Sequence, residues 1–116
     1  MDLKYQKQRI QDVVVNPMLA MIHDFEWDLY NEQDVAACQA ILEAYVESLA
    51  ALDDPSDEAI MEQVEKVVIA LNEWNEPNDF IETEEREWLW EVIQKSAIDC
   101  GLQNVPDDVT EEWREW

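Results

Sequence analysis

The stretch DPSDEAIMEQVEKVVIALNEW, residues 54–74, carries the clearest structural signal of the chain. Asp54 is suited to cap the N-terminus of a helix, and Pro55 fits the first helical position, where a missing N–H costs nothing. The apolar residues behind them recur at alternating spacings of four and three, which indicates one buried helical face: Ile60, Val64, Val67, Leu71 and Trp74. We expect this helix to lie at the centre of a small bundle, with the other helices around it.

A second helix is predicted over residues 31–52, immediately before that stretch. Asn31 is a favourable N-cap, and the apolar residues again alternate by three and four: Val35, Cys38, Leu42, Tyr45, Leu49 and Leu52. Only a few residues separate the two helices, so they should form an antiparallel hairpin.

The N-terminal region should also be helical. Asn16 and Pro17 are expected to end a short helix over residues 2–15 and to start the next one, as N-cap and first helical residue. The apolar face of this next helix should consist of Met18, Leu19, Ile22 and Phe25, with Leu29 as a further candidate. The β-branched run Val13–Val15 leaves a strand as the alternative for the first region.

The last third of the chain is expected to cover the hairpin. Thr83 is predicted to cap a helix that ends at Gly101, the expected left-handed residue beyond a helix C-terminus. A short extended piece near residues 80–82 should plug the core before this helix. The tail, residues 102–116, should dock on the bundle, with Thr110 capping a final turn.

Composition agrees with a helical fold. The chain has 116 residues, 47% of them hydrophobic, which is enough for one core. Its single glycine disfavours sheet folds and phosphate-binding loops, which use glycine freely at turns. The prediction is an all-α, compact four- to five-helix bundle that forms a single domain over residues 1–116.

The strongest signal of function is the net charge of −22, with 29 acidic residues against seven Lys and Arg. The charge is uneven, because residues 1–16 sum to +1 and residues 17–116 sum to −23. Such a surface repels nucleic acids and anionic membranes and attracts basic proteins at a salt-dependent rate. We therefore expect a basic protein partner, no direct nucleic-acid binding and no membrane binding. The alternative is that the acidity serves only solubility.

Catalytic and metal-binding patterns are weak. His23 is the single histidine, and no serine or cysteine lies in a strained turn of the Gly-x-Ser-x-Gly type. A di-iron bundle needs two Glu-x-x-His pairs, and zinc needs Cys and His clusters. A calcium loop needs a central glycine, which the alternating Asp24, Glu26 and Asp28 lack. The chain is predicted not to be an enzyme and to hold no cofactor or metal.

Cysteine usage and hydropathy predict the compartment. Cys38 and Cys100 each lie in an apolar helical stretch, which predicts buried, free thiols in a reducing environment. The chain shows no basic-then-apolar leader, and its longest apolar runs, such as Val67–Leu71, are too short to span a bilayer. A cytoplasmic protein is expected, as a monomer or a homodimer.

Two patches of acidic and aromatic residues are the candidate partner-binding residues. The first patch consists of Asp24, Glu26, Trp27, Asp28, Tyr30, Glu32 and Asp34. The second patch consists of Glu73, Trp74, Glu76, Asp79 and Glu82. Carboxylates around an exposed aromatic ring suit a basic protein surface, because the ring anchors the contact and the charges steer the encounter. The alternative is that Trp27, Tyr30 and Trp74 are core residues at helix ends, with the acids as their solvated neighbours.

Size, charge and helical class favour an acidic binding module that neutralises a basic partner. The simplest such module is an immunity-type inhibitor of a bacterial toxin, for example a nuclease with a basic cleft. One alternative is a DNA mimic with an antirestriction or anti-defence role, which needs carboxylates along one elongated side at phosphate-like spacing. Another is a structural or adaptor protein, in which an exposed apolar patch would mark the partner.

Overall fold

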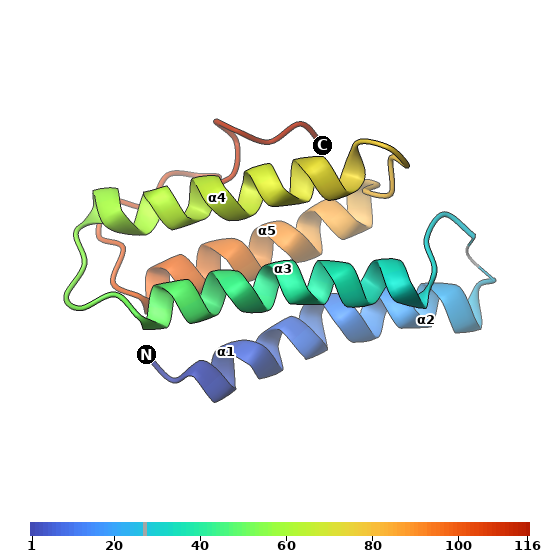
Figure 1. The fold of residues 1–116 in the computed structure, drawn as a ribbon, viewed down its shortest axis with the longest axis horizontal. Helices are drawn as coiled ribbons and strands as arrows, with labels where there is room; N and C mark the ends of the chain where they lie inside the picture. The colour runs from blue at the N-terminus through green and yellow to red at the C-terminus, as the bar shows by residue number, and fades with distance from the viewer. Residues whose placement is uncertain (27) are drawn as a thin grey trace.

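The hairpin predicted from the two apolar stripes is present in the structure, a computed structural model that describes residues 1–26 and 28–116. It consists of α3, Glu32–Ala50, and α4, Asp57–Asn75, which lie antiparallel and side by side (Figure 1). The expected central position of the helix after Asp54 is wrong, because α4 lies at the edge of the bundle and the N-terminal helix packs against α3 instead. The stripe residues inside both helices are buried, except for Trp74, which is partly buried. The spacing of apolar residues therefore predicted this part of the fold correctly.

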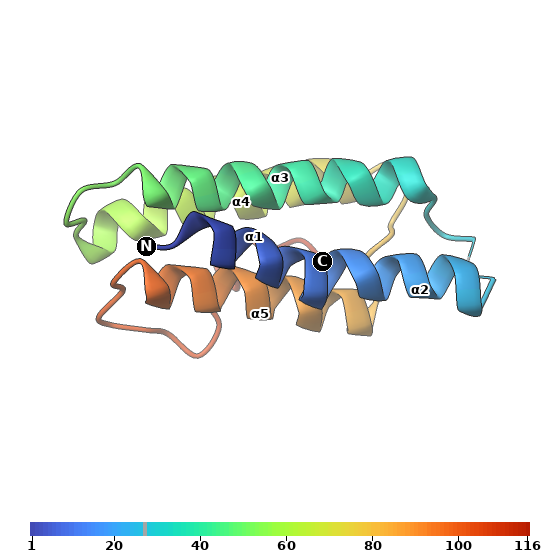
Figure 2. The same ribbon diagram turned by 90° about the horizontal axis from the view of Figure 1, so that it is seen from below.

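The remaining helices pack against this hairpin. They are α1, Leu3–Ile10, the π-helical segment η1, Gln11–Val15, α2, Asn16–Asp24, and α5, Thr83–Asp99. Seen from below, α1 and α2 run along one face of the bundle, with α3 on one side and α5 on the other (Figure 2). Within the described residues the chain is all-α, as predicted, and forms a bundle of four helices when α1, η1 and α2 are taken as one.

The predicted stop at Asn16 is wrong, because the N-terminal helix continues through Asn16, which is not an N-cap. Pro17 lies in the first turn of α2, as predicted. Proline lacks an N–H and its ring clashes with the preceding turn of an α-helix. The preceding turn is widened to the π-helical segment η1, in which the Asn16 N–H binds the carbonyl of Gln11. The wider turn accommodates the proline and turns Val14 and Val15 into the core. A strand at residues 13–15 is therefore also excluded.

The helix caps confirm some of the predictions and correct others. Asn31 forms the expected N-cap of α3, with a reciprocal bond between its backbone N–H and the carboxylate of Asp34. The cap of α4 is Ser56, whose Oγ accepts the N–H of Ala59 at 3.1 Å. Asp54 lies outside the helix with a left-handed φ of 46°. Because α4 begins later than predicted, Asp57 lies in its first turn, where its carboxylate binds the tail.

At α5 the predicted N-cap is wrong and the predicted C-terminal end is confirmed. Glu82, not Thr83, is its N-cap, and a capping box joins Glu82 to Glu85. Gly101 has a φ of +113°, and the N–H of Leu102 reaches the carbonyl of Ala97 at 3.1 Å. This pattern is the expected left-handed termination, which glycine adopts without strain.

The segments flanking α5 fill the core without regular structure. Phe80 and Ile81 are buried, so residues 80–82 plug the core as expected but form no strand. In the tail, Leu102 and Val109 are buried, and the chain runs past α4 (Figure 1). Thr110 does not cap a turn, because its hydroxyl donates to Asp108 at 2.6 Å.

A buried asparagine holds the tail against α4. The Asn72 side chain donates to the carbonyl of Trp113 at 2.8 Å and accepts the N–H of Glu115 at 3.1 Å. Trp113 and Trp116 pack partly buried against the core. The tail is therefore docked on the bundle, while the assignment of the chain as a single domain stays a prediction. None of the described helices combines the length and the hydropathy needed to cross a bilayer.

Candidate protein-binding surface

The fold brings the two predicted patches to the same end of the bundle. Because α3 and α4 are antiparallel, the loop before α3 and the loop after α4 lie together, at the right of Figure 1. We call this region, residues 24–34 and 73–82, the loop end. Trp27, which the sequence placed in the first patch, lies outside the described residues.

A groove of about 820 Å³ lies between the first patch and the loop after α4. One wall comes from the first patch and the start of α3, with Asp28, Glu32 and Asp34. The other wall comes from Asn78 and Phe80, which flank Asp79 in the sequence. The groove is therefore lined by the first patch, whereas the residues of the second patch lie nearby in the chain and do not line it.

The carboxylates of the loop end are mostly directed at solvent. Those that are exposed are Asp24, Glu26, Asp28, Glu32, Glu73, Glu76, Asp79 and Glu82. Asp34 is only half-buried and is engaged in the cap of α3. Among the described residues, the contact of His23 Nε2 with Glu32 Oε1 at 3.2 Å is the single pairing of a basic side chain with a carboxylate at this end. The negative charge is therefore concentrated here without internal compensation by Lys or Arg.

Two of the predicted aromatic anchors lie inside the molecule instead. Tyr30 is 3% exposed, and its hydroxyl donates to the buried carboxylate of Glu85 at 2.9 Å. Burial and the nearby Glu85 raise the pKa of Tyr30. Phe80 packs edge-on against Tyr30 and, at 4.9 Å between ring centroids, against Trp74. Tyr30 and Trp74 thus support the loop end from beneath, in agreement with the alternative interpretation as core residues at helix ends.

Among the described residues of the loop end, the exposed aromatic residue is Phe25, which the sequence pattern had assigned to the buried face of its helix. Its side chain is 70% exposed. Since α2 ends at Asp24, Phe25 is the C-cap residue and leaves the helical register. Glu26 follows with a left-handed φ of 53°, which turns the chain sharply. The sequence feature that could have indicated this exposure is the position of Phe25 between two acids, Asp24 and Glu26.

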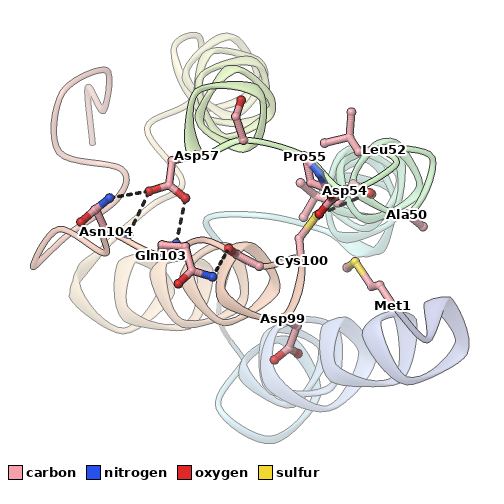
Figure 3. Close-up of a pocket in the computed structure, with 13 residues that line it drawn as sticks. Met1, Ala50, Leu52, Asp54, Pro55, Asp57, Asp99, Cys100, Gln103 and Asn104 are labelled. Carbon is pink, nitrogen blue, oxygen red and sulfur yellow. Dashed lines mark hydrogen bonds between the residues drawn. The ribbon is translucent and has the colours of Figure 1, made fainter.

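The opposite end of the bundle provides a comparison. We call residues 1–9, 50–58 and 99–104 the turn end. It holds a hollow of about 690 Å³ between the N-terminus, the α3–α4 turn and the end of α5 (Figure 3). Asp57 and Asp99 both line it.

Two carboxylates of this hollow are bound by the chain itself. Asp57 accepts the backbone N–H groups of Gln103 at 2.8 Å and Asn104 at 2.9 Å, and these bonds lower its pKa (Figure 3). Asp99 accepts the Gln6 amide at 2.8 Å and pairs with Arg9 at 2.9 Å. These two acids of the turn end therefore close the fold, whereas Asp54, which also lines the hollow, is exposed.

The thiols and the acids show no reactive arrangement. Both cysteines are free, as predicted, although Cys100 is only partly buried. Burial raises the pKa of the Cys38 thiol to about 12, and it also raises that of Cys100, so both are protonated at neutral pH. In the part of the chain that the structure describes, no three His, Cys, Asp or Glu side chains converge on a possible metal position. The expectations of no enzyme activity and no cofactor stay predictions.

Comparisons of the chain with protein-family models, with curated proteins and with solved structures find no match. What the chain does is therefore inferred from its own surface.

Proposed function

We propose that this chain is an acidic protein-binding module that neutralises a basic partner through its loop end. The observation that supports this proposal is the exposed ring of Phe25 among carboxylates that have no Lys or Arg partner within the described residues. An immunity-type inhibitor of a bacterial toxin, acting in the cytoplasm, is the class that fits best.

The carboxylates and the aromatic ring would contribute to binding in different ways. Exposed carboxylates attract a basic surface over roughly 10 Å, the Debye length near physiological salt, and so raise the association rate. An aromatic side chain that is buried on contact supplies affinity that salt does not screen. Phe25 lies directly between Asp24 and Glu26, so one short turn offers both contributions.

The test is affinity capture from an extract of the native cells, eluted with a salt gradient. The loop-end triple variant, Asp24→Asn, Glu26→Gln and Asp28→Asn, should release the partner at lower salt than the wild type. A turn-end triple variant, Asp53→Asn, Asp54→Asn and Glu58→Gln, removes the same charge from exposed positions at the other end. Equal effects of the two triples would contradict the proposal, since binding would then depend on net charge alone.

The shape of the molecule favours a DNA mimic as the second candidate. The principal extents are 44 × 28 × 20 Å. A net charge of −22 along the 44 Å axis is about one negative charge per 2 Å, against one per about 1.7 Å in duplex DNA. Added duplex DNA would release several DNA-binding proteins together from a mimic, whereas a toxin inhibitor would retain one cognate partner.

A further inference from the structure

A second hollow, on the side of the bundle, is apolar. It lies between α3 and α4, has a volume of about 370 Å³ and has almost wholly apolar walls: Ala40, Ile41, Ala44, Tyr45, Val67 and Ala70. Ala40 and Ala44 are exposed, so the groove is open to solvent. The tail does not line it.

We propose that this groove binds an amphipathic helix of a partner protein, with one apolar face and a cationic flank. A helix laid into a groove between two helices is a recurring mode of recognition, with anchors at i, i+3, i+4 and i+7. The groove runs from Ala40 to Ser48 along α3, about 12 Å at the rise of an α-helix, which matches about two turns of a ligand helix. The small side chains of Ala40, Ala44 and Ala70 allow the ligand backbone to come close.

The charges along the α4 side of the groove identify the flank of this ligand. Glu73 follows Ala70 by three residues, which places it on the neighbouring surface of α4, and it is exposed. Glu62 lies one turn before Lys66, the single cation of the groove lining, and is also exposed. On the α3 side, Glu43 is directed to Gln39 and the hollow beside α1 instead. Cationic side chains on the flank of the ligand helix that faces α4 would therefore meet carboxylates.

The same charges argue against other occupants. Two copies of this chain would bring together surfaces with a net charge of −22 each, so self-association through the groove is opposed by repulsion. An acidic amphipathic helix is excluded by the same repulsion. The groove lining shares no residue with the loop end, which touches the groove only at its flank through Glu73, and this proposal does not rest on the proposed function.

The probe is a synthetic helical peptide of leucine and lysine, about 18 residues long, with leucines at i, i+3, i+4 and i+7. Two control peptides are needed, one with the same composition and alternating leucines and one with glutamate in place of lysine. Binding to isotope-labelled protein is followed by NMR amide shifts and by calorimetry. The expected result is that the amide shifts of the wild type are largest at residues 40–48 and 63–70, for the leucine–lysine helix only.

A matched pair of variants locates the contact. Ala44→Arg fills the groove and should weaken peptide binding by about tenfold or more. Ala36→Arg adds the same side chain to an exposed position of α3 outside the groove and should leave binding close to the wild-type value. The loop-end triple variant should keep the shifts at the groove, which separates this result from that of the proposed function.

Three results would overturn the proposal. One is a set of amide shifts confined to the loop end, and another is an equal loss of binding in both arginine variants. The third is a concentration-dependent dimer in sedimentation that Ala44→Arg alone dissociates, because the occupant would then be a second copy of the chain. The amide shifts of the wild type decide the question even if Ala44→Arg unfolds.

Discussion

The two ends of the bundle carry the same kind of side chain and use it differently. At the turn end, Asp57 and Asp99 accept hydrogen bonds from distant parts of the chain and close the fold. At the loop end, carboxylates such as Asp24, Glu26 and Asp28 are exposed, and no ion pair involves them among the described residues. Only acids of the second kind are available to a partner without a loss of native contacts.

A carboxylate of the first kind also lies beneath the loop end, at the start of α5. Glu85 is 1% exposed and accepts the Tyr30 hydroxyl at 2.9 Å and the Glu82 N–H at 3.0 Å. It ties the segment before α3 to the start of α5, beneath the exposed acids. The comparison between the ends is therefore a comparison between acids that are hydrogen-bonded within the chain and acids that are not, and it can also be tested at this end of the bundle alone.

Among the acids, replacing Glu85 should have the largest effect on stability. Glu85→Ala leaves the Tyr30 hydroxyl without its partner, opens a cavity and removes half of the capping box of α5. We expect a loss of about 2–3 kcal/mol in the free energy of unfolding, measured by urea denaturation.

Glu84→Ala is the matched control, because Glu84 is exposed in the same first turn of α5. It should change the free energy of unfolding by less than about 0.5 kcal/mol. Equal losses in the two variants would show that charge at the helix N-terminus, and not the buried network, stabilises this end.

Asp57→Asn should have the next largest effect. The hydrogen bonds from Gln103 and Asn104 lower the pKa of Asp57 in the folded protein, so its ionised form stabilises the fold. This stabilisation is fully present above the pKa of an unfolded aspartate, about 3.9, and is lost as the pH falls through the lower folded pKa. The melting temperature of the variant should therefore lie below that of the wild type at neutral pH, and the difference should vanish in acid.

Glu58→Gln removes the same charge from the same first turn of α4, at an exposed position. It therefore controls for the interaction with the helix dipole. A pH profile of the melting temperature that is the same for both variants would refute the role of the bonds to the tail.

The residues of these tests show what the sequence could and could not predict. Helix positions depend on local spacing, so the stripes of α3 and α4 and the termination at Gly101 were predictable. Contacts between distant residues were not: Asp57 meets Gln103 across 46 positions, and Tyr30 meets Glu85 across 55. A composition so rich in acids does not reveal which of them are bound.

The same limit applies to the candidate site. The sequence pointed to the acids of the loop end, and the fold brings its two patches to one end of the bundle, where the first patch lines a groove. It assigned Phe25 to the core, because an apolar residue one turn after Ile22 continues a helical stripe if the helix continues. The helix α2 ends at Asp24, so this assumption fails. No glycine or proline near Asp24 marks the end of the helix in the sequence.

Neutralising the exposed acids of the loop end should have a small effect of the opposite sign. The triple variant Asp24→Asn, Glu26→Gln and Asp28→Asn removes no hydrogen bond found between described residues and reduces repulsion in a chain of net charge −22. Its melting temperature should equal or exceed that of the wild type at low salt. A lower melting temperature would mean that these acids stabilise the fold, and the distinction between the two ends would fail.

Phe25→Ala should have the smallest effect on stability. This variant tests most directly whether the exposed ring of the loop end serves binding alone. Phe25 is 70% exposed, so its removal should change the free energy of unfolding by less than about 0.5 kcal/mol. Phe80→Ala is the internal reference, since Phe80 is 4% exposed at the same end and should cost about 3 kcal/mol or more. If Phe25→Ala keeps wild-type stability and still releases the captured partner at lower salt, the ring serves binding alone. If it destabilises the protein as Phe80→Ala does, Phe25 belongs to the core, and the loop end loses its anchor.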